Sequence, residues 1–221
     1  MPRTRLKVCC ISSRAEAQLA IAHGADALGL VGTMPSGPGP IPDDLIADIA
    51  RAVPPPIATF LLTSEVDPDA VVAHVRRAHV NTVQLVDDET QPDVYRALRT
   101  ELPAIRIVQV IHVIDDTSID RALTAAPHVD ALLLDSGNPG AQIRELGGTG
   151  RTHNWDVSRT IVERSPVPVF LAGGLRADNI ASAVAAVRPY GVDLCSGVRT
   201  NGALDAAKLD RFVTRLRATA G

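Results

Sequence analysis

The stretches HGADALGLV at residues 23–31 and YGVDLCSGV at residues 190–198 decide the fold of this 221-residue chain. In each, a helical segment ends, a glycine (Gly24 or Gly191) turns the chain, and an apolar strand begins. The strands are nearly continuous apolar runs, which is typical of parallel strands that are buried on both faces. We therefore expect strands and helices to alternate, with the strands parallel.

The same alternation continues along the whole chain and predicts eight strand–helix units. Strands are expected near Leu6–Ile11, Ala25–Val31, Ile57–Leu62, Thr82–Val86, Ile105–Ile111, Val129–Asp135, Pro168–Ala172 and Val192–Ser196. Helices are expected at Arg14–Ala22, Asp43–Ala52, Pro68–Ala78, Gln91–Leu102, Ser118–Ala125, Asp156–Arg164, Ala177–Val187 and Ala203–Thr219. Eight such units in series favour a closed (β/α)₈ barrel over an open doubly wound sheet. We expect an α/β protein with a single barrel domain at residues 1–221.

Composition narrows the function classes. A net charge of −3 argues against a general nucleic-acid or membrane binder. No apolar run reaches the length of a membrane span, and the N-terminal residues do not resemble a signal peptide. The three cysteines, Cys9, Cys10 and Cys195, have no regular spacing and do not predict a disulfide framework. We expect a reduced cytoplasmic protein that acts on a small molecule.

Active sites of (β/α)₈ barrels lie at the C-terminal ends of the strands. This rule selects Cys9, Cys10, Asp135, Asp193, Cys195 and Ser196 as candidate site residues. Asp135 closes the apolar run DALLLD, and a carboxylate in that position needs either solvent or a partner. Gly173-Gly174 and Ser196-Gly197 follow the last two strands, where barrels commonly bind phosphate through backbone N–H groups. The alternative is that these glycines only form tight turns.

A cysteine in an apolar strand is more often a small core residue than a catalytic group, so Cys9 has two interpretations. Adjacent residues of a strand point to opposite faces, and we therefore do not expect Cys9 and Cys10 to share a metal ion. Cys195 is expected near Cys9, because the first and last strands are neighbours in a closed barrel. We favour free thiols over a disulfide there.

The motifs of these candidates resemble a known family. They are KVCCIS at residues 7–12, GADALGLV at 24–31, VQLVDDE at 83–89, LLLD at 132–135, GGTGRT at 147–152, LAGGL at 171–175 and RPYGVDLCSGV at 188–198. Together they are similar, in order and over nearly the whole chain, to the phosphoribosylanthranilate isomerase family of tryptophan biosynthesis. The resemblance implies a (β/α)₈ barrel that carries out an Amadori rearrangement of a phosphorylated aminosugar without a cofactor.

The resemblance also implies roles for individual residues. Asp135 would be the general acid that protonates the furanose ring oxygen, and Cys9 would be the general base, as thiolate, that removes the proton from C2. Phosphate would bind at Gly173, Gly174, Ser196 and Gly197, the loop residues Gly148, Thr149 and Gly150 would close over the substrate, and Asp193 would contact a substrate hydroxyl. A thiol base needs a lowered pKa, and Lys7, on the same face of the strand as Cys9, would supply positive potential.

The chain departs from the family where the aromatic carboxylate would bind. Gly39 stands at the position of the family's arginine, and Cys10 stands where the family has glycine. An arginine binds a carboxylate with two charge-assisted hydrogen bonds, which glycine cannot replace. Arg144, Arg151 or Arg199 is a candidate replacement. These departures leave open an isomerase of another phosphosugar adduct, or a phosphosugar-binding barrel without turnover. The chain is expected to be a monomer or a homodimer.

Overall fold

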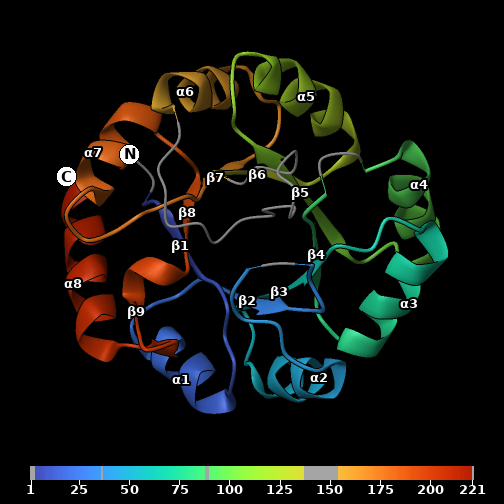
Figure 1. Ribbon diagram of the computed structural model, residues 1–221, viewed down its shortest axis with the longest axis horizontal. Helices are drawn as coiled ribbons and strands as arrows, with labels where there is room; N and C mark the ends of the chain where they lie inside the picture. Colours follow the sequence, from blue (N-terminus) through green and yellow to red (C-terminus); the bar gives the residue numbers. More distant parts are fainter. Residues whose placement is uncertain (1–2, 36, 88–89, 137–153, 221) are drawn as a thin grey trace.

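The computed structural model describes residues 3–35, 37–87, 90–136 and 154–220, and it confirms the expected barrel. Eight parallel strands close into a ring, and eight helices surround it (Figure 1). The strands are β1 (Arg5–Val8), β2 (Ala27–Val31), β3 (Ala58–Thr63), β4 (Thr82–Leu85), β5 (Arg106–His112), β6 (Ala131–Asp135), β7 (Val169–Leu171) and β8 (Gly191–Leu194). The helices are α1 (Arg14–Ala22), α2 (Asp43–Ala52), α3 (Pro68–Ala78), α4 (Pro92–Glu101), α5 (Thr117–Ala125), α6 (Trp155–Arg164), α7 (Ile180–Val187) and α8 (Ala206–Arg217).

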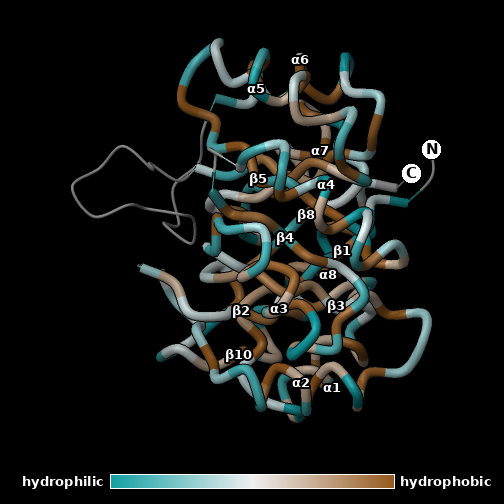
Figure 2. Tube along the Cα trace, turned by 90° about the vertical axis from the view of Figure 1, so that its right-hand side faces the viewer, coloured by the Kyte–Doolittle hydropathy of each residue, from teal (hydrophilic) through white to brown (hydrophobic). Residues whose placement is uncertain are grey.

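Two apolar clusters hold the barrel together. The larger one lies between the strands and the helices, and the smaller one fills the inside of the ring with side chains such as Phe60, Leu133 and Phe170. Figure 2 shows the apolar residues concentrated along the strands and the polar residues along the outer loops and helices. The strands are buried on both faces for this reason, as their uninterrupted apolar sequence predicted.

The first and last strands close the ring. Lys7 of β1 lies opposite Asp193 of β8 and, on its other side, opposite Ala27 of β2. Every second residue of a strand points into the barrel, and each such residue lies nearer the C-terminal end than the one before it. On β1 these positions run from Arg5 at the N-terminal end, through Lys7, to Cys9 just beyond the C-terminal end.

Three predicted boundaries differ from the structure by three residues, and the others that differ do so by one or two. The first strand, expected to reach Ile11, ends at Val8, because Cys10 adopts a left-handed backbone conformation with φ 62°. The helix expected from Ala203 begins at Ala206 instead. The residues before it form an antiparallel hairpin of β9 (Arg199–Thr200) and β10 (Ala203–Leu204), which Gly202 turns with φ 82°. The pair Asn201-Gly202, with φ of 50° and 82°, is a typical two-residue hairpin turn, and it is the sequence signal that the prediction missed.

The third corrected boundary is that of the seventh helix, which was expected from Ala177 and begins at Ile180. The side chain of Asn179 occupies the entry to this helix. Its oxygen accepts a hydrogen bond from the Arg176 N–H at 2.8 Å, and its amide donates to the carbonyl of Gly174 at 2.9 Å. These bonds hold the segment before the helix in a turn.

The N-terminal end of the barrel carries an open cavity of about 670 Å³. Small side chains line its wall, among them Ala27, Ala58 and Ala131, and the rings of Phe60 and Phe170 lie against it. The two rings meet edge to face with centroids 6.2 Å apart. None of the helices in the described part of the chain has the length and apolar character of a membrane span.

Candidate active site

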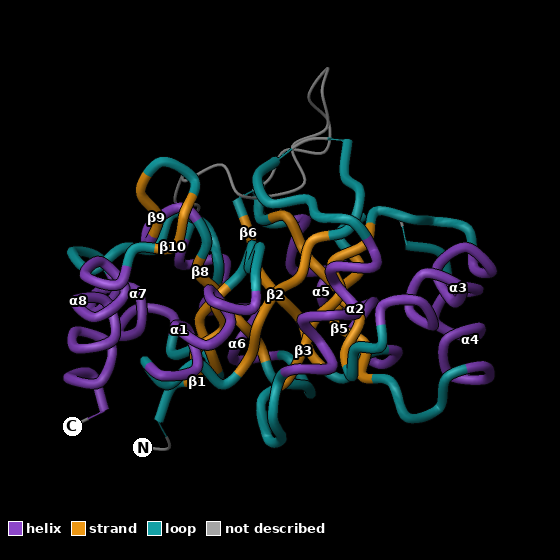
Figure 3. Tube along the Cα trace, turned by 90° about the horizontal axis from the view of Figure 1, so that it is seen from below, coloured by secondary structure: helices purple, strands orange, loops and turns teal. Residues whose placement is uncertain are grey.

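A pocket of about 70 Å³ lies at the C-terminal ends of the strands. This is the face that carries the β9–β10 hairpin, opposite both chain ends in Figure 3. The pocket brings together the candidates that the strand-end rule selected: Cys9, Cys10, Asp135, Gly173, Gly174, Asp193, Cys195, Ser196 and Gly197. Residues that are far apart in the sequence meet here because all the strands of the ring point the same way.

Cys9 lies just after β1, and only 6% of its surface is exposed. Its N–H donates to the carbonyl of Leu194 at 2.7 Å, which ties it to the neighbouring strand β8. A hydrogen bond from the Cys10 thiol lowers the pKa of Cys9; burial opposes this effect, and the Lys7 ammonium reinforces it. The environment therefore favours the thiolate, the form in which cysteine acts as a base or nucleophile.

Lys7 and Asp193 form a buried ion pair beneath Cys9. The distance between Lys7 Nζ and Asp193 Oδ2 is 2.7 Å, and the lysine is fully buried. Burial raises the pKa of Asp193, and the Lys7 ammonium offsets part of that rise. Within the described residues Asp193 Oδ1 is buried and accepts no hydrogen bond. Because Asp193 also lines the pocket, this oxygen is a ready acceptor for a ligand hydroxyl.

Asp135 is the last residue of β6 and is 9% exposed. One carboxylate oxygen, Oδ1, accepts a hydrogen bond from the Ser136 N–H at 2.7 Å. Asp135 and Asp193 are close enough to interact, because the charge of Asp135 adds to the rise in the pKa of Asp193. Two carboxylates and a thiol with a lowered pKa thus share one pocket, and only Asp193 has a lysine partner.

The two glycine turns meet at the pocket. Gly173 and Gly174 have φ of 81° and 60°, a region that favours glycine, and Ser196 begins the short 3₁₀ turn η2 (Ser196–Val198). A Cβ added to Gly197 would lie 2.1 Å from the carbonyl oxygen of Leu175. The turn after β8 therefore packs directly on the chain that follows β7. Because these glycines line the pocket without side chains, phosphate oxygens can approach their backbone N–H groups closely.

Cys10 and Gly39, the two residues that depart from the family's pattern, lie in direct contact with each other. A Cβ added to Gly39 would lie 2.7 Å from the Cβ of Cys10. The Cys10 thiol also lies 3.6 Å from the carbonyl oxygen of Pro38, on the same loop as Gly39. The side chain of Cys10 therefore occupies the space that a side chain at residue 39 would need.

Three free thiols cluster around this part of the pocket. Hydrogen bonds with Cys195 and Cys9 raise the pKa of Cys10 well above its usual value, and burial adds to the rise. Cys10 therefore stays a thiol, and its single proton can be donated either to Cys9 or to the Pro38 carbonyl. The prediction that Cys195 lies near Cys9 agrees with this arrangement, because both line the same pocket. Among the described residues, no group of three or more His, Cys, Asp or Glu side chains is arranged to hold a metal ion.

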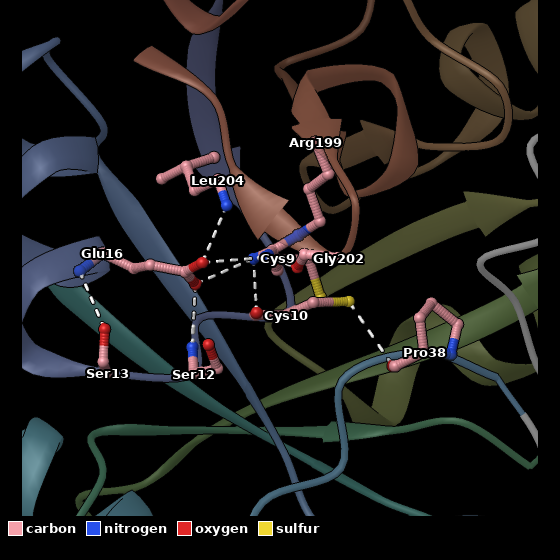
Figure 4. Close-up of polar contacts among 9 residues, drawn as sticks. All are labelled: Cys9, Cys10, Ser12, Ser13, Glu16, Pro38, Arg199, Gly202 and Leu204. Carbon is pink, nitrogen blue, oxygen red and sulfur yellow. Dashed lines mark hydrogen bonds and ion pairs between the residues drawn. The ribbon is translucent and has the colours of Figure 1, made fainter.

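Arg199 does not reach the pocket, although the sequence suggested it as a carboxylate partner. Its side chain is 8% exposed and forms an ion pair with Glu16 of α1, with Nη1–Oε1 at 3.0 Å. Figure 4 shows the guanidinium between the Glu16 carboxylate and the backbone of Cys9 and Cys10. The other suggested residues, Gly148, Thr149, Gly150, Arg144 and Arg151, lie outside the described residues.

Gln84 is a pocket residue that the sequence interpretation missed. It lines the pocket from β4, is 3% exposed, and its Oε1 has no hydrogen-bond partner within the described residues. A polar side chain in an otherwise apolar strand was the available signal. Buried polar atoms without partners are rare and often face a ligand.

Comparison with known proteins assigns this constellation to a family. The model of the N-(5'-phosphoribosyl)anthranilate (PRA) isomerase family matches residues 6–215. The chain belongs to this family. A PRA isomerase from Methanocella arvoryzae is 35% identical over 98% of this chain and 99% of its own length. The structure of PRA isomerase from Pyrococcus furiosus has a TM-score of 0.81 at 26% identity, covering 98% of this chain and 100% of that one.

A further family structure contains a ligand. It is a PRA isomerase in complex with reduced 1-(o-carboxyphenylamino)-1-deoxyribulose 5-phosphate, with a TM-score of 0.79 at 24% identity. The match covers 97% of this chain and 99% of that chain. At this identity the likeness shows the fold alone. The resemblance of the sequence motifs to the PRA isomerase family is thus confirmed over the full barrel.

Proposed function

We propose that the protein is a PRA isomerase that uses Asp135 as general acid and Cys9 as general base. The observation that carries this proposal is the pairing of a thiol with a lowered pKa and a strand-end carboxylate in one pocket, beside two phosphate-type turns. The family's relatives named PRA isomerase support the same reaction. A barrel that only bound a phosphosugar would have no use for a matched acid and base.

Two proton transfers begin the reaction, one to the furanose ring oxygen and one from C2, and both of these atoms are bonded to C1 of the sugar. Asp135 gives its proton to the furanose ring oxygen, the C1–O bond breaks, and the nitrogen lone pair forms the C1=N bond of a Schiff base. The Cys9 thiolate then removes the proton from C2, and the electron pair moves through C1 to nitrogen to give an enolamine. Tautomerisation to the 2-ketone completes the Amadori rearrangement. The net reaction moves hydrogen from C2 to C1 and requires no external oxidant or reductant.

The remaining pocket residues position the substrate. The Asp193 oxygen without a partner accepts a hydrogen bond from a sugar hydroxyl, while Lys7 holds the other oxygen. Gly173, Gly174, Ser196 and Gly197 bind the 5-phosphate through their backbone, at the turns after β7 and β8. The loop glycines Gly148 and Gly150, with Thr149, remain a prediction.

The aromatic end of the substrate is the open part of the proposal. Gly39 provides no guanidinium, Cys10 occupies the adjacent space, and Arg199 is committed to Glu16. We propose Arg144 or Arg151 as the carboxylate partner. The second candidate function, isomerisation of another phosphosugar adduct, is favoured by the same filled space at Cys10.

A turnover assay tests the function. Purified, reduced protein is given phosphoribosylanthranilate, and the loss of substrate fluorescence is followed. Cys9→Ser and Asp135→Asn are each expected to lower kcat by about 10²–10⁴-fold. Asp93→Asn, an exposed carboxylate on α4 that is 67% accessible, is the matched control and is expected to retain full activity. The native chain should also rescue a tryptophan auxotroph that lacks the isomerase. Folded, reduced protein without turnover would contradict the PRA isomerase assignment and favour the second candidate.

The same proposal covers the domain organisation, cofactor requirement, location and oligomeric state of the protein. We take residues 1–221 to form one catalytic domain that works without a cofactor in the cytoplasm, as a monomer or a homodimer. Its partner is the phosphosugar, not a nucleic acid or a membrane. Sedimentation of the purified chain at micromolar concentration measures its oligomeric state.

A further inference from the structure

Arg199 and Glu16 form an enclosed ion pair at the edge of the pocket. Their side chains are 8% and 12% exposed. Two nearly parallel contacts join them, Nη1–Oε1 at 3.0 Å and Nη2–Oε2 at 3.1 Å. A charge pair this far from solvent is costly unless its geometry is good and its remaining hydrogen-bonding groups are satisfied.

Two backbone N–H groups donate hydrogen bonds to the carboxylate of Glu16, in addition to those from Arg199. The N–H groups of Ser12 and Leu204 donate to its carboxylate at 3.0 and 2.8 Å. Burial alone would raise the pKa of Glu16, but the hydrogen bonds from Arg199, Leu204 and Ser12 hold it below its usual value. Glu16 is therefore ionised at neutral pH, and it joins the start of α1 to the hairpin that follows β8.

The same two nitrogens of Arg199 also hold the backbone of the proposed base, whereas its Nε has no hydrogen-bond partner within the described residues. Nη2 of Arg199 donates to the carbonyl oxygens of Cys9, at 3.2 Å, and of Cys10, while Nη1 donates to the carbonyl of Gly202 at 2.7 Å (Figure 4). Cys9 and Cys10 lie beyond the end of β1, and Cys10 adopts φ 62°, which a residue with a side chain rarely does. A strained turn of this kind persists only where the surroundings hold it.

We propose that Arg199, held by Glu16, is a positioning residue for Cys9, because it fixes the left-handed turn at Cys10 and with it the donors that face the Cys9 thiol. Those donors are the thiol and the N–H of Cys10, and both lower the pKa of Cys9. Arg199 itself does not line the pocket. The catalytic consequence rests on the proposed function, whereas the effect on the Cys9 thiol does not.

The test measures the ionisation of Cys9 without using substrate. Alkylation by iodoacetamide is followed as a function of pH, and tandem mass spectrometry separates modified Cys9 from modified Cys10. Arg199→Met is expected to raise the pH midpoint of Cys9 alkylation by about one unit, which makes the reaction about tenfold slower at neutral pH. Arg199→Lys, which keeps one charged donor, should recover part of the shift. The acid limb of kcat/KM for phosphoribosylanthranilate should move upward by the same amount.

Arg14→Met is the matched control. Arg14 also forms a two-point ion pair from α1, with its Nε 2.6 Å from Asp48 Oδ2, but its side chain is 56% exposed and it holds no backbone of the pocket. Its loss should leave the Cys9 midpoint unchanged. Glu16→Gln, which keeps the shape of the carboxylate, covers the case in which Arg199→Met fails to fold, and it should also raise the midpoint.

An unchanged Cys9 midpoint in the folded Arg199 and Glu16 variants, with only a lower melting temperature, would overturn the proposal. That result would make the pair a structural clamp alone. Native protein that fails to isomerise phosphoribosylanthranilate would contradict the proposed function, but the alkylation midpoints would still decide the role of Arg199.

Discussion

The two ends of the barrel use the same strands for different purposes. At the C-terminal end, thiols and carboxylates line a pocket of about 70 Å³. At the N-terminal end, a cavity of about 670 Å³ is lined by alanines and aromatic rings together with charged side chains such as Arg5 and Asp130. On β6, for example, Ala131 faces the cavity and Asp135 faces the pocket. Although only three residues lie between Ala131 and Asp135, changes at the N-terminal end should affect stability and changes at the C-terminal end should affect chemistry.

The largest expected effect is at Lys7, between the two ends. Lys7→Met removes the partner of the buried Asp193 and should destabilise the protein by about 3–5 kcal/mol in urea unfolding. Arg5→Met is the control on the same strand. Arg5 is 44% exposed and lies 3.3 Å from Asp26, so its loss should cost less than about 1 kcal/mol. An equal loss in the free energy of unfolding in the two variants would show that burial does not make the Lys7–Asp193 pair more important for stability than the Arg5–Asp26 pair.

Substitutions of two glycines, Gly191 on β8 and Gly197 after it, should distinguish an effect on phosphate binding from an effect on packing. Gly197→Ala would place its Cβ against the carbonyl of Leu175 and force the turn to move, so the inhibition constant of inorganic phosphate should rise about 10–100-fold, equivalent to about 1.4–2.8 kcal/mol. Gly191→Ala, at the N-terminal end, would contact the ring of Phe170 at 2.6 Å. It should lower stability and leave phosphate inhibition unchanged. The reverse pattern would contradict the assignment of the phosphate site.

A pH profile should distinguish the two adjacent cysteines. Cys10→Gly removes the thiol that donates to Cys9, so the pKa of Cys9 should rise by up to about one unit. Because the base acts as thiolate, kcat/KM should fall at neutral pH and recover as the pH rises. Glycine also accepts the φ of 62° at this position, so the variant should fold. An acid limb that stays in place would show that Cys10 does not tune the base.

The smallest expected effect is at Ala131. Ala131→Val adds apolar volume beside the N-terminal cavity and should stabilise the protein by about 1 kcal/mol in urea unfolding, with unchanged turnover. Ala172→Val makes the same change at the pocket. It should lower kcat/KM for phosphoribosylanthranilate with little gain in stability. Loss of turnover in Ala131→Val would mean that the two ends are coupled.

The barrel and the membership of the pocket were predictable because they depend on local patterns. The apolar run that ends in Asp135 and the run Gly191–Leu194 that contains Asp193 mark two strands and the edge of the barrel at which they end. The coupling of Cys10 with Gly39 was not predictable, because it is a contact between two loops whose separate sequences give no sign of it. The direction of the Arg199 side chain was not predictable, since its partner Glu16 lies 183 residues earlier in the chain, although Asn201-Gly202 does indicate the hairpin that carries Arg199.

The closure of the ring has a consequence for how the chain folds during synthesis. Lys7 and Asp193 are 186 residues apart, and Glu16 and Arg199 are 183 apart. The ribosome therefore releases β1, with its lysine, long before either partner exists. Contacts this distant in sequence form slowly and leave apolar strand edges exposed in the meantime. We expect the proposed base to reach its working environment only in the last step of folding, when the final strand joins the first.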